Sequence, residues 1–206
     1  MKNILKYAGI LFAITLLVGS VLAVVNAQTQ GIIARLSINE EEKSRDSVVG
    51  GMSDYTSSEK IGDNIWAYKK GDDVSAWAVL KTAKGYGGDI KVMVGIDRDL
   101  RIISQNILDQ SETPGLGANC ENDTFLRQFI GKTIDMQVKK SGPYNDNDIQ
   151  AITGATITTK AVTGAANEAV EQVKVILDAE AEAEAAAKAK AEQEAAAAAE
   201  AENNAE

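Results

Sequence analysis

Hydroxyl side chains cluster around a Gly-Ala pair in the stretch 148–160, immediately before a segment with apolar residues at helical spacing. Gly154 can adopt the positive φ that other residues resist. Thr156, Thr158 and Thr159 are candidates for the N-cap or the first turn of a helix. A helix start offers free N–H groups and partial positive charge, so it stabilises a phosphate without a dedicated cation. The stretch therefore predicts a phosphate or phosphoester site, although hydroxyl caps are also the ordinary way in which helices begin.

A second stretch, Glu112–Gly117, combines a Pro-Gly turn with a lone apolar side chain. Pro114 fixes one turn dihedral, and the glycines on either side of Leu116 allow another group to approach the backbone closely. Such a loop can press Leu116 against a flat ring and offer N–H groups to its polar edges. Taken alone, the same residues are typical of an ordinary Pro-Gly turn. The Gly85–Gly88 segment does not match the dinucleotide-binding fingerprint, because no helix follows it.

The composition excludes several kinds of active site. The 206 residues include no His and one Cys, Cys120. A Ser-His-Asp triad, a His-ligated haem, a four-Cys cluster and an ordinary zinc site are therefore ruled out, and any redox chemistry needs an organic cofactor. Cys120 is expected to be a small loop or core residue. The net charge of −9 argues against a nucleic-acid partner, which favours a basic face.

An apolar run without charged residues, 7–27, follows Lys2 and Lys6. About 20 apolar residues match the hydrocarbon thickness of a bilayer, whereas the apolar part of a cleaved signal peptide usually has about 7–15. The length favours an uncleaved anchor, although Val25-Asn26-Ala27 resembles a cleavage site. The first basic residue beyond the run is Arg35. The positive-inside rule then predicts a single-pass protein of the cell membrane, with a cytoplasmic amino terminus and the bulk of the chain on the outer face.

Between Ile61 and Val138 the dominant signal is antiparallel sheet. β-Branched and aromatic residues are enriched in four runs that read as two consecutive hairpins: 65–68, 74–80, 90–96 and 100–108. A short helix is predicted at 123–130 and a further strand at 133–138. After Thr158, apolar residues recur at helical spacing as far as Leu177, so we expect a helix that packs on the sheet.

The predicted fold is α+β and has five parts. Residues 1–6 form a cytoplasmic end, 7–27 a transmembrane helix, 28–60 a stalk and linker, 61–177 the folded domain, and 178–206 an Ala/Glu-rich tail. The tail has helical propensity but no large apolar side chain with which to build a core. We therefore expect it to be solvated and partly disordered.

Three features together resemble the FMN-binding domain family. They are the Gly-Tyr-Gly-Gly entry to a strand at 85–88, the Glu-Thr-Pro-Gly-Leu-Gly loop at 112–117, and Thr153-Gly-Ala-Thr156 at a helix start about 40 residues later. Within that family the chain looks like the G subunits of Rnf-type ion-translocating ferredoxin:NAD oxidoreductases, which are related to the C subunits of sodium-pumping NADH:quinone reductases. The resemblance extends from Met1 to about Leu177 and omits the tail. Its most specific part is Ser/Thr-Gly-Ala-Thr, the flavinylation signature of the family.

The resemblance implies one FMN, joined covalently to Thr156 through a phosphoester by a separate flavin transferase. The other cofactor-binding residues that it implies are Thr153, Gly154 and Ala155 of the signature and Glu112, Thr113, Leu116 and Gly117 of the loop. Lys160 is close enough in sequence to offer a charge to the phosphate, although a Lys in a first helical turn is usually solvated. One position departs from the family pattern: Gln150 stands where an Asp is usual, and the nearest acid is Asp148.

The implied function is electron transfer in a redox-driven ion-translocating oxidoreductase. The chain would be one part of a larger assembly and not catalytic alone, with no catalytic residue and no metal of its own. Its partners would be membrane and iron–sulfur subunits of the complex, the membrane itself and the transferase. Two alternatives stay open: a stand-alone membrane-anchored flavoprotein on the outer face, and an anchored binding or scaffold module without cofactor, in which Thr156 only caps a helix.

Overall fold

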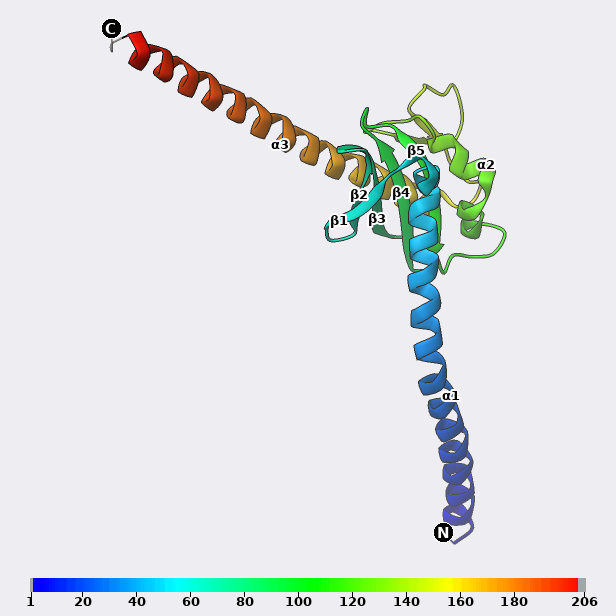
Figure 1. Cartoon of the computed structure of the whole chain (residues 1–206). Helices are drawn as coiled ribbons and strands as arrows, with labels where there is room; N and C mark the ends of the chain where they lie inside the picture. Colours follow the sequence, from blue (N-terminus) through cyan, green and yellow to red (C-terminus); the bar gives the residue numbers. More distant parts are fainter. Residues whose placement is uncertain (1, 204–206) are drawn as a thin grey trace. The chain divides into compact units, whose positions relative to one another are not determined.

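The computed structural model describes residues 2–203, which divide after Lys43 into two units. Helix α1 (Lys2–Val48) is continuous, and its part Lys6–Gly31 is, among the described residues, the one helix long and apolar enough to cross a membrane (Figure 1). Every side chain from residue 6 to residue 31 is exposed. An apolar helix that buries none of its surface in protein matches the predicted anchor at 7–27.

The folded part of the chain is built on one antiparallel sheet with the strand order β1-β2-β3-β4-β5. The strands are β1 (Ser57–Gly62), β2 (Ile65–Lys70), β3 (Asp73–Lys84), β4 (Asp89–Asp97) and β5 (Ile102–Asp109). The last four correspond to the four predicted strands, and the α+β class is confirmed.

The stalk and linker predicted at 28–60 differ from the structure. Helix α1 continues to Val48, a 3₁₀ turn η1 covers Met52–Asp54, and β1 begins at Ser57, before the predicted domain boundary at residue 61. All six residues of β1 are exposed, so the strand has no alternation of apolar residues. Its pairing with β2 holds it in place, and such pairing leaves no signal in the sequence.

Short elements connect the sheet to the last helix. They are η2 (Gly117–Glu121), α2 (Asp123–Leu126), η3 (Arg127–Phe129), β6 (Gln137–Lys139) and β7 (Asp148–Gln150). The helix predicted at 123–130 is thus one α-turn followed by a 3₁₀ turn. The strand predicted at 133–138 is confined to β6, because Asp135 has a φ of 66° that interrupts the extended backbone. Strand β7 pairs with β6 in parallel.

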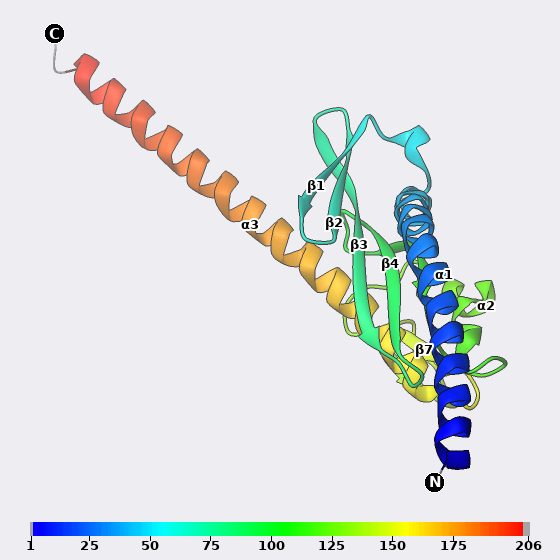
Figure 2. The ribbon, with the colours of Figure 1, turned by 90° about the horizontal axis from the view of Figure 1, so that it is seen from below.

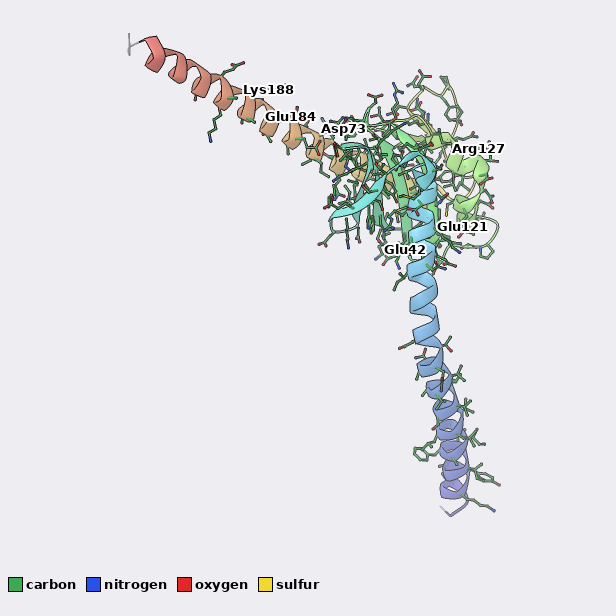
Figure 3. All side chains as sticks on the ribbon, viewed as in Figure 1. Glu42, Asp73, Glu121, Arg127, Glu184 and Lys188 are labelled. Atoms are coloured by element: carbon green, nitrogen blue, oxygen red, sulfur yellow. The ribbon has the colours of Figure 1, made fainter. Side chains whose placement is uncertain are left out.

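Helix α3 (Thr156–Asn203) lies along one face of the sheet, against β3 and β4 (Figure 2). Its apolar stripe enters the main core, in which Cys120 is also fully buried as predicted. The stripe consists of Val162, Ala165, Ala166, Ala169, Val170 and Val173. The tail differs from the disorder we expect, since it continues α3 as helix, with every side chain from 178 to 193 exposed. Figure 3 labels Glu184 and Lys188 on this part of the helix.

The opposite face of the sheet is covered by the end of α1. Val48 and Val49 are buried in a second cluster with Trp66, Tyr68 and Met93. The Tyr68 hydroxyl donates to Asp46 at 2.7 Å and accepts from Arg45 Nε at 3.1 Å. Burial and the Asp46 carboxylate together raise the pKa of Tyr68 well above its ordinary value. This cluster ties residues 44–49 to the sheet.

At Gly95 of β4 the backbone of the sheet lies directly against the end of α1. A Cβ at this position would lie 2.0 Å from the Val48 carbonyl oxygen, so Gly95→Ala must displace the end of α1. We expect a loss of about 1–3 kcal/mol in the free energy of unfolding. Gly164→Ala in α3 is the control, because a Cβ there meets nothing within 4 Å and improves helix propensity by up to about 1 kcal/mol. Thermal unfolding of the purified full chain checks both; equal midpoints would contradict the packing described.

Candidate functional site

A cavity of about 750 Å³ lies between the loop at 112–117, the loop at 151–155 and the first turn of α3. Its volume is in the range of small-molecule sites, roughly 300–1,000 Å³. Eight of the nine residues that the sequence singles out line it: Glu112, Thr113, Leu116, Gly117, Thr153, Gly154, Ala155 and Thr156. The fold therefore brings together two motifs that lie about 40 residues apart in the chain.

Lys160, the ninth residue, does not line the cavity and is exposed on α3. The cation that does line it is Lys140, which the sequence gives no reason to choose. The Ala151 N–H donates to the Lys139 carbonyl at 2.8 Å, and this bond sets the end of β6 beside the loop that leads to Thr153. The other lining residues, which the sequence analysis did not assign to the cofactor, are Tyr86 of the Gly-Tyr-Gly-Gly segment and Ala151, Ile152, Ile157 and Thr158 of the stretch 148–160.

The first turn of α3 lines the cavity and has free N–H groups. The first bond of the helix is donated by the Thr159 N–H to the Ala155 carbonyl at 3.0 Å, so the N–H groups of Thr156, Ile157 and Thr158 have no partner within the helix. Before this turn, Gly154 has a φ of 77°, and a Cβ on it would lie 3.0 Å from Leu116. A glycine at this position lets Leu116 close over the turn.

The threonine hydroxyls of this region fall into two groups. Thr158 is 1% exposed and donates to Glu112; Thr159 is fully buried, donates to the Ala155 carbonyl at 2.9 Å and accepts from the Ile152 N–H at 3.0 Å. Thr156 is half-buried and Thr153 exposed, and neither hydroxyl has a hydrogen bond in the described part of the chain. None of the threonines is the N-cap, because Ala155 precedes the first helical residue.

The carboxylate of Glu112 connects three segments that border the cavity. Its Oε1 accepts from the Gly87 N–H at 2.8 Å, and its Oε2 accepts from the Thr158 hydroxyl at 2.5 Å. The side chain is 7% exposed, and no Lys or Arg of the described residues lies within 4.0 Å of it. Burial of a carboxylate without a cation is costly unless hydrogen bonds replace its water. These two bonds provide that replacement.

The glycines on both sides of this carboxylate leave the space that it occupies. A Cβ on Gly85 would lie 2.3 Å from Glu112 Oε1, and a Cβ on Gly117 would lie 2.4 Å from Oε2. A Cβ on Gly87 would lie 2.1 Å from the Ser111 carbonyl oxygen. Gly85 and Gly117 thus leave room for the carboxylate itself, and Gly87 lets its segment approach the backbone of the residue before Glu112.

Comparison with known proteins places the cavity in a recognised domain. Residues 85–171 match the model of the FMN-binding domain. The chain is 37% identical over 164 residues to the G subunit of the proton-translocating ferredoxin:NAD(+) oxidoreductase complex of Clostridium ljungdahlii, an alignment that covers 80% of this chain and 82% of that protein. The chain belongs to the family of these G subunits.

Two further relatives agree with this assignment. The G subunit of the Na(+)-translocating ferredoxin:NAD(+) oxidoreductase complex of Acetobacterium woodii is 31% identical over 82% of this chain and 91% of that protein. The G subunit of the ion-translocating oxidoreductase complex of Methanosarcina acetivorans is 29% identical over 84% and 95%. A solved structure, the C subunit of the Na(+)-translocating NADH-quinone reductase from Parabacteroides distasonis, aligns with a TM-score of 0.44 and 24% identity over 52% of this chain and 58% of that chain.

The residues of the cavity fit FMN as a ligand. The free N–H groups at the start of α3 suit a phosphate. Tyr86, Leu116 and Ile157 are apolar lining residues with exposed fractions of 73%, 43% and 55%, so they offer surface to a flat ring. A predominantly apolar wall with a few placed polar groups is the usual composition of a cofactor site.

The position that departs from the family pattern, Gln150, lies at the end of β7 with its side chain exposed. Its N–H donates to Gln128 Oε1 at 2.8 Å. The nearest acid does not take its place, because Asp148 is 8% exposed and its Oδ2 accepts from the Asn145 N–H and from Lys139 Nζ, each at 2.6 Å. The Asn145 N–H and then Lys139 hold the pKa of Asp148 below its ordinary value.

Replacing Thr158 by Val should destabilise the protein, because it removes the hydroxyl donor while leaving the Glu112 carboxylate buried. We expect a loss of about 1.5–3 kcal/mol, the usual contribution of a hydrogen bond to a charged group. Thr163→Val is the matched control, since the Thr163 hydroxyl is also buried but donates to a helix carbonyl, that of Thr159. Urea unfolding of the two variants measures the difference. An equal loss in both would show that the carboxylate does not depend on Thr158.

The lowered pKa of Asp148 predicts a pH-dependent contribution to stability. The ionised form is favoured in the folded state, so the contribution is present above the unfolded pKa of about 3.9 and is lost as the pH falls through the lower folded value. Asp148→Asn should therefore lower the unfolding temperature at neutral pH, and the gap to the wild type should close in acid. The exposed Asp146→Asn is the control. A gap that persists unchanged at about pH 2, well below the unfolded pKa, would contradict the assignment.

Proposed function

We propose that the chain carries one FMN, attached covalently through a phosphoester to Thr156, and transfers electrons within a membrane-bound ion-translocating ferredoxin:NAD oxidoreductase complex. The observation that carries this proposal is the cavity, where an unbonded Thr156 hydroxyl lies at the N-terminus of α3 beside the 112–117 loop. Membership of the family of G subunits supports the electron-transfer role.

The hydrogen bonds of the region support Thr156 as the point of attachment. Thr158 and Thr159 are buried, and their hydroxyl protons are donated within the protein, so neither oxygen is accessible. Thr153 and Thr156 remain as accessible hydroxyls. Thr156 is the first residue of α3, so a phosphate on its oxygen meets the free N–H groups of the first turn. Thr153 precedes the helix and offers a phosphate no comparable set of donors.

FMN supplies the electron-transfer chemistry when it is bound, and the chain supplies binding and orientation. Leu116 and the first turn of α3 border the space for the ring. The Glu112 carboxylate fixes the loop that carries Leu116 against that turn. No side chain of the cavity needs to act as an acid or a base in this role, in agreement with a protein that is not catalytic alone.

The remaining parts of the proposal concern partners and location. The relatives are named as subunits of ion-translocating complexes. By extension, we propose that this chain contacts membrane and iron–sulfur subunits of such a complex and that a flavin transferase matures it. The helix Lys6–Gly31 would be its single membrane anchor, and the charges near it favour a cytoplasmic amino terminus with the flavin domain on the outer face.

The attachment is tested by expressing the full chain together with a flavin transferase. We expect in-gel flavin fluorescence and a flavin-modified peptide containing Thr156 in the wild type, and loss of both in Thr156→Ala. Thr153→Ala is the matched control, because it removes the other accessible hydroxyl, and it should keep its flavin. Unfolding temperatures verify that both variants fold. An unmodified Thr156 peptide from the wild type would refute covalent attachment there, and would favour a module in which Thr156 only begins a helix.

A further inference from the structure

The cavity contains one cation whose role the family assignment does not define. Lys140 lines the cavity together with Thr153 and Thr156, and it comes from the segment after β6 rather than from either sequence motif. Glu112 is the one carboxylate among the lining residues, and both of its oxygens accept hydrogen bonds from the protein. Among the lining residues, Lys140 is therefore the one source of a full positive charge.

Lys139, the last residue of β6, and Lys140, which follows it, have different surroundings. Lys139 Nζ lies 2.6 Å from Asp148 Oδ2, in an ion pair with a largely buried carboxylate. Lys140 has no ion pair in the described part of the chain. Its side chain is exposed, so the ammonium group is able to turn to an anion in the cavity. Lys139, in contrast, is already paired with Asp148.

The backbone keeps Lys140 beside the threonines. Strands β6 and β7 pair in parallel, with Val138 opposite Ile149 and Lys139 opposite Gln150. The Ala151 N–H then binds the Lys139 carbonyl, so Lys140 emerges next to the loop that ends at Thr156. Lys160, by contrast, is exposed on α3 and is not among the residues that line the cavity.

The charge of the proposed phosphoester matches this arrangement. A phosphate joined to both the flavin and a threonine is a diester with one negative charge. The helix start contributes about half a positive charge, so about half of the negative charge is left for a cation to offset. Resting on the proposed attachment at Thr156, we infer that Lys140 is the residue that neutralises and positions the flavin phosphate, and that Lys160 is not.

The same charge acts while the bond forms. The Thr156 oxygen forms a bond to phosphorus, the bond from phosphorus to the phosphate leaving group of a flavin dinucleotide donor breaks, and the hydroxyl proton passes to solvent. Electrons and oxidation states are unchanged in this transfer. Lys140 assists by holding the negatively charged phosphate next to the Thr156 oxygen.

The experiment measures the rate at which the purified full chain gains flavin from a flavin dinucleotide and a flavin transferase, by intact mass. We expect Lys140→Gln to slow incorporation about two- to fivefold, the range expected for one exposed ion pair. Lys140→Arg should restore the rate. Lys160→Gln, which removes a charge from the same region of the surface, should react as the wild type does. Unfolding temperatures establish that the variants fold equally well.

Salt separates an electrostatic role from a structural one. At about 1 M salt the Debye length falls to about 3 Å, so the ratio of wild-type to Lys140→Gln rates should approach one. A deficit that is independent of salt, a Lys140→Gln rate equal to that of the wild type, or a deficit in Lys160→Gln alone would each overturn the role of Lys140. A wild-type chain that gains no flavin would overturn the proposed attachment as well, and is thus distinguishable from the other three results.

Discussion

The cavity depends on one buried carboxylate. Glu112 accepts from the Gly87 N–H before β4 and from the Thr158 hydroxyl in α3, so a single side chain joins three segments that are remote in sequence. Each bond to a charged group contributes about 1.5–3 kcal/mol, whereas an unbonded carboxylate at this depth would cost several. Loss of either hydrogen-bond donor would therefore destabilise the fold. A Cβ at Gly85 or Gly117 would also destabilise it, because the Cβ would clash with the carboxylate. The shape of the cavity follows from this contact.

The same contact determines which hydroxyls are accessible. Thr158 lines the cavity, but its buried hydroxyl donates to Glu112, and the buried Thr159 hydroxyl is bonded to the turn at 152–155. What remains at the helix start is Thr156, with its oxygen free and the first-turn N–H groups beside it. The buried stripe of α3 holds that start rigidly on β3 and β4. A reactive group on a fixed helix terminus is positioned more reliably than one on a loop.

The sequence predicts those features that are local or periodic. Strands β2, β3 and β4 are buried on both faces over much of their length, so they contain runs of apolar, β-branched and aromatic residues, whereas α3 has one buried stripe; both patterns are visible in the sequence. Strand β1 is exposed on both faces and leaves no such pattern. The two motifs identify most of the cavity wall. Glycines at a turn and threonines at a helix start have roles that depend on the local backbone, so a short stretch of sequence is enough to predict them. Lys140 is different: its place depends on the parallel pairing of β6 with β7, which no local pattern encodes. Lys160 is close in sequence to the signature, yet it does not line the cavity.

The proposed covalent bond to the cofactor would also account for how exposed the site is. A cofactor held by contacts alone needs enclosure, since binding must compensate the loss of translational and rotational freedom. Tyr86, Leu116 and Ile157 keep roughly half or more of their surface in solvent, so the wall that they form is shallow on that side. A phosphoester at Thr156 makes retention independent of the contact area and of the free flavin concentration. With such a bond the ring edge would be accessible to a redox partner, and the chain would need to fix only the phosphate end, near the helix start, Thr156 and Lys140, which line the same cavity.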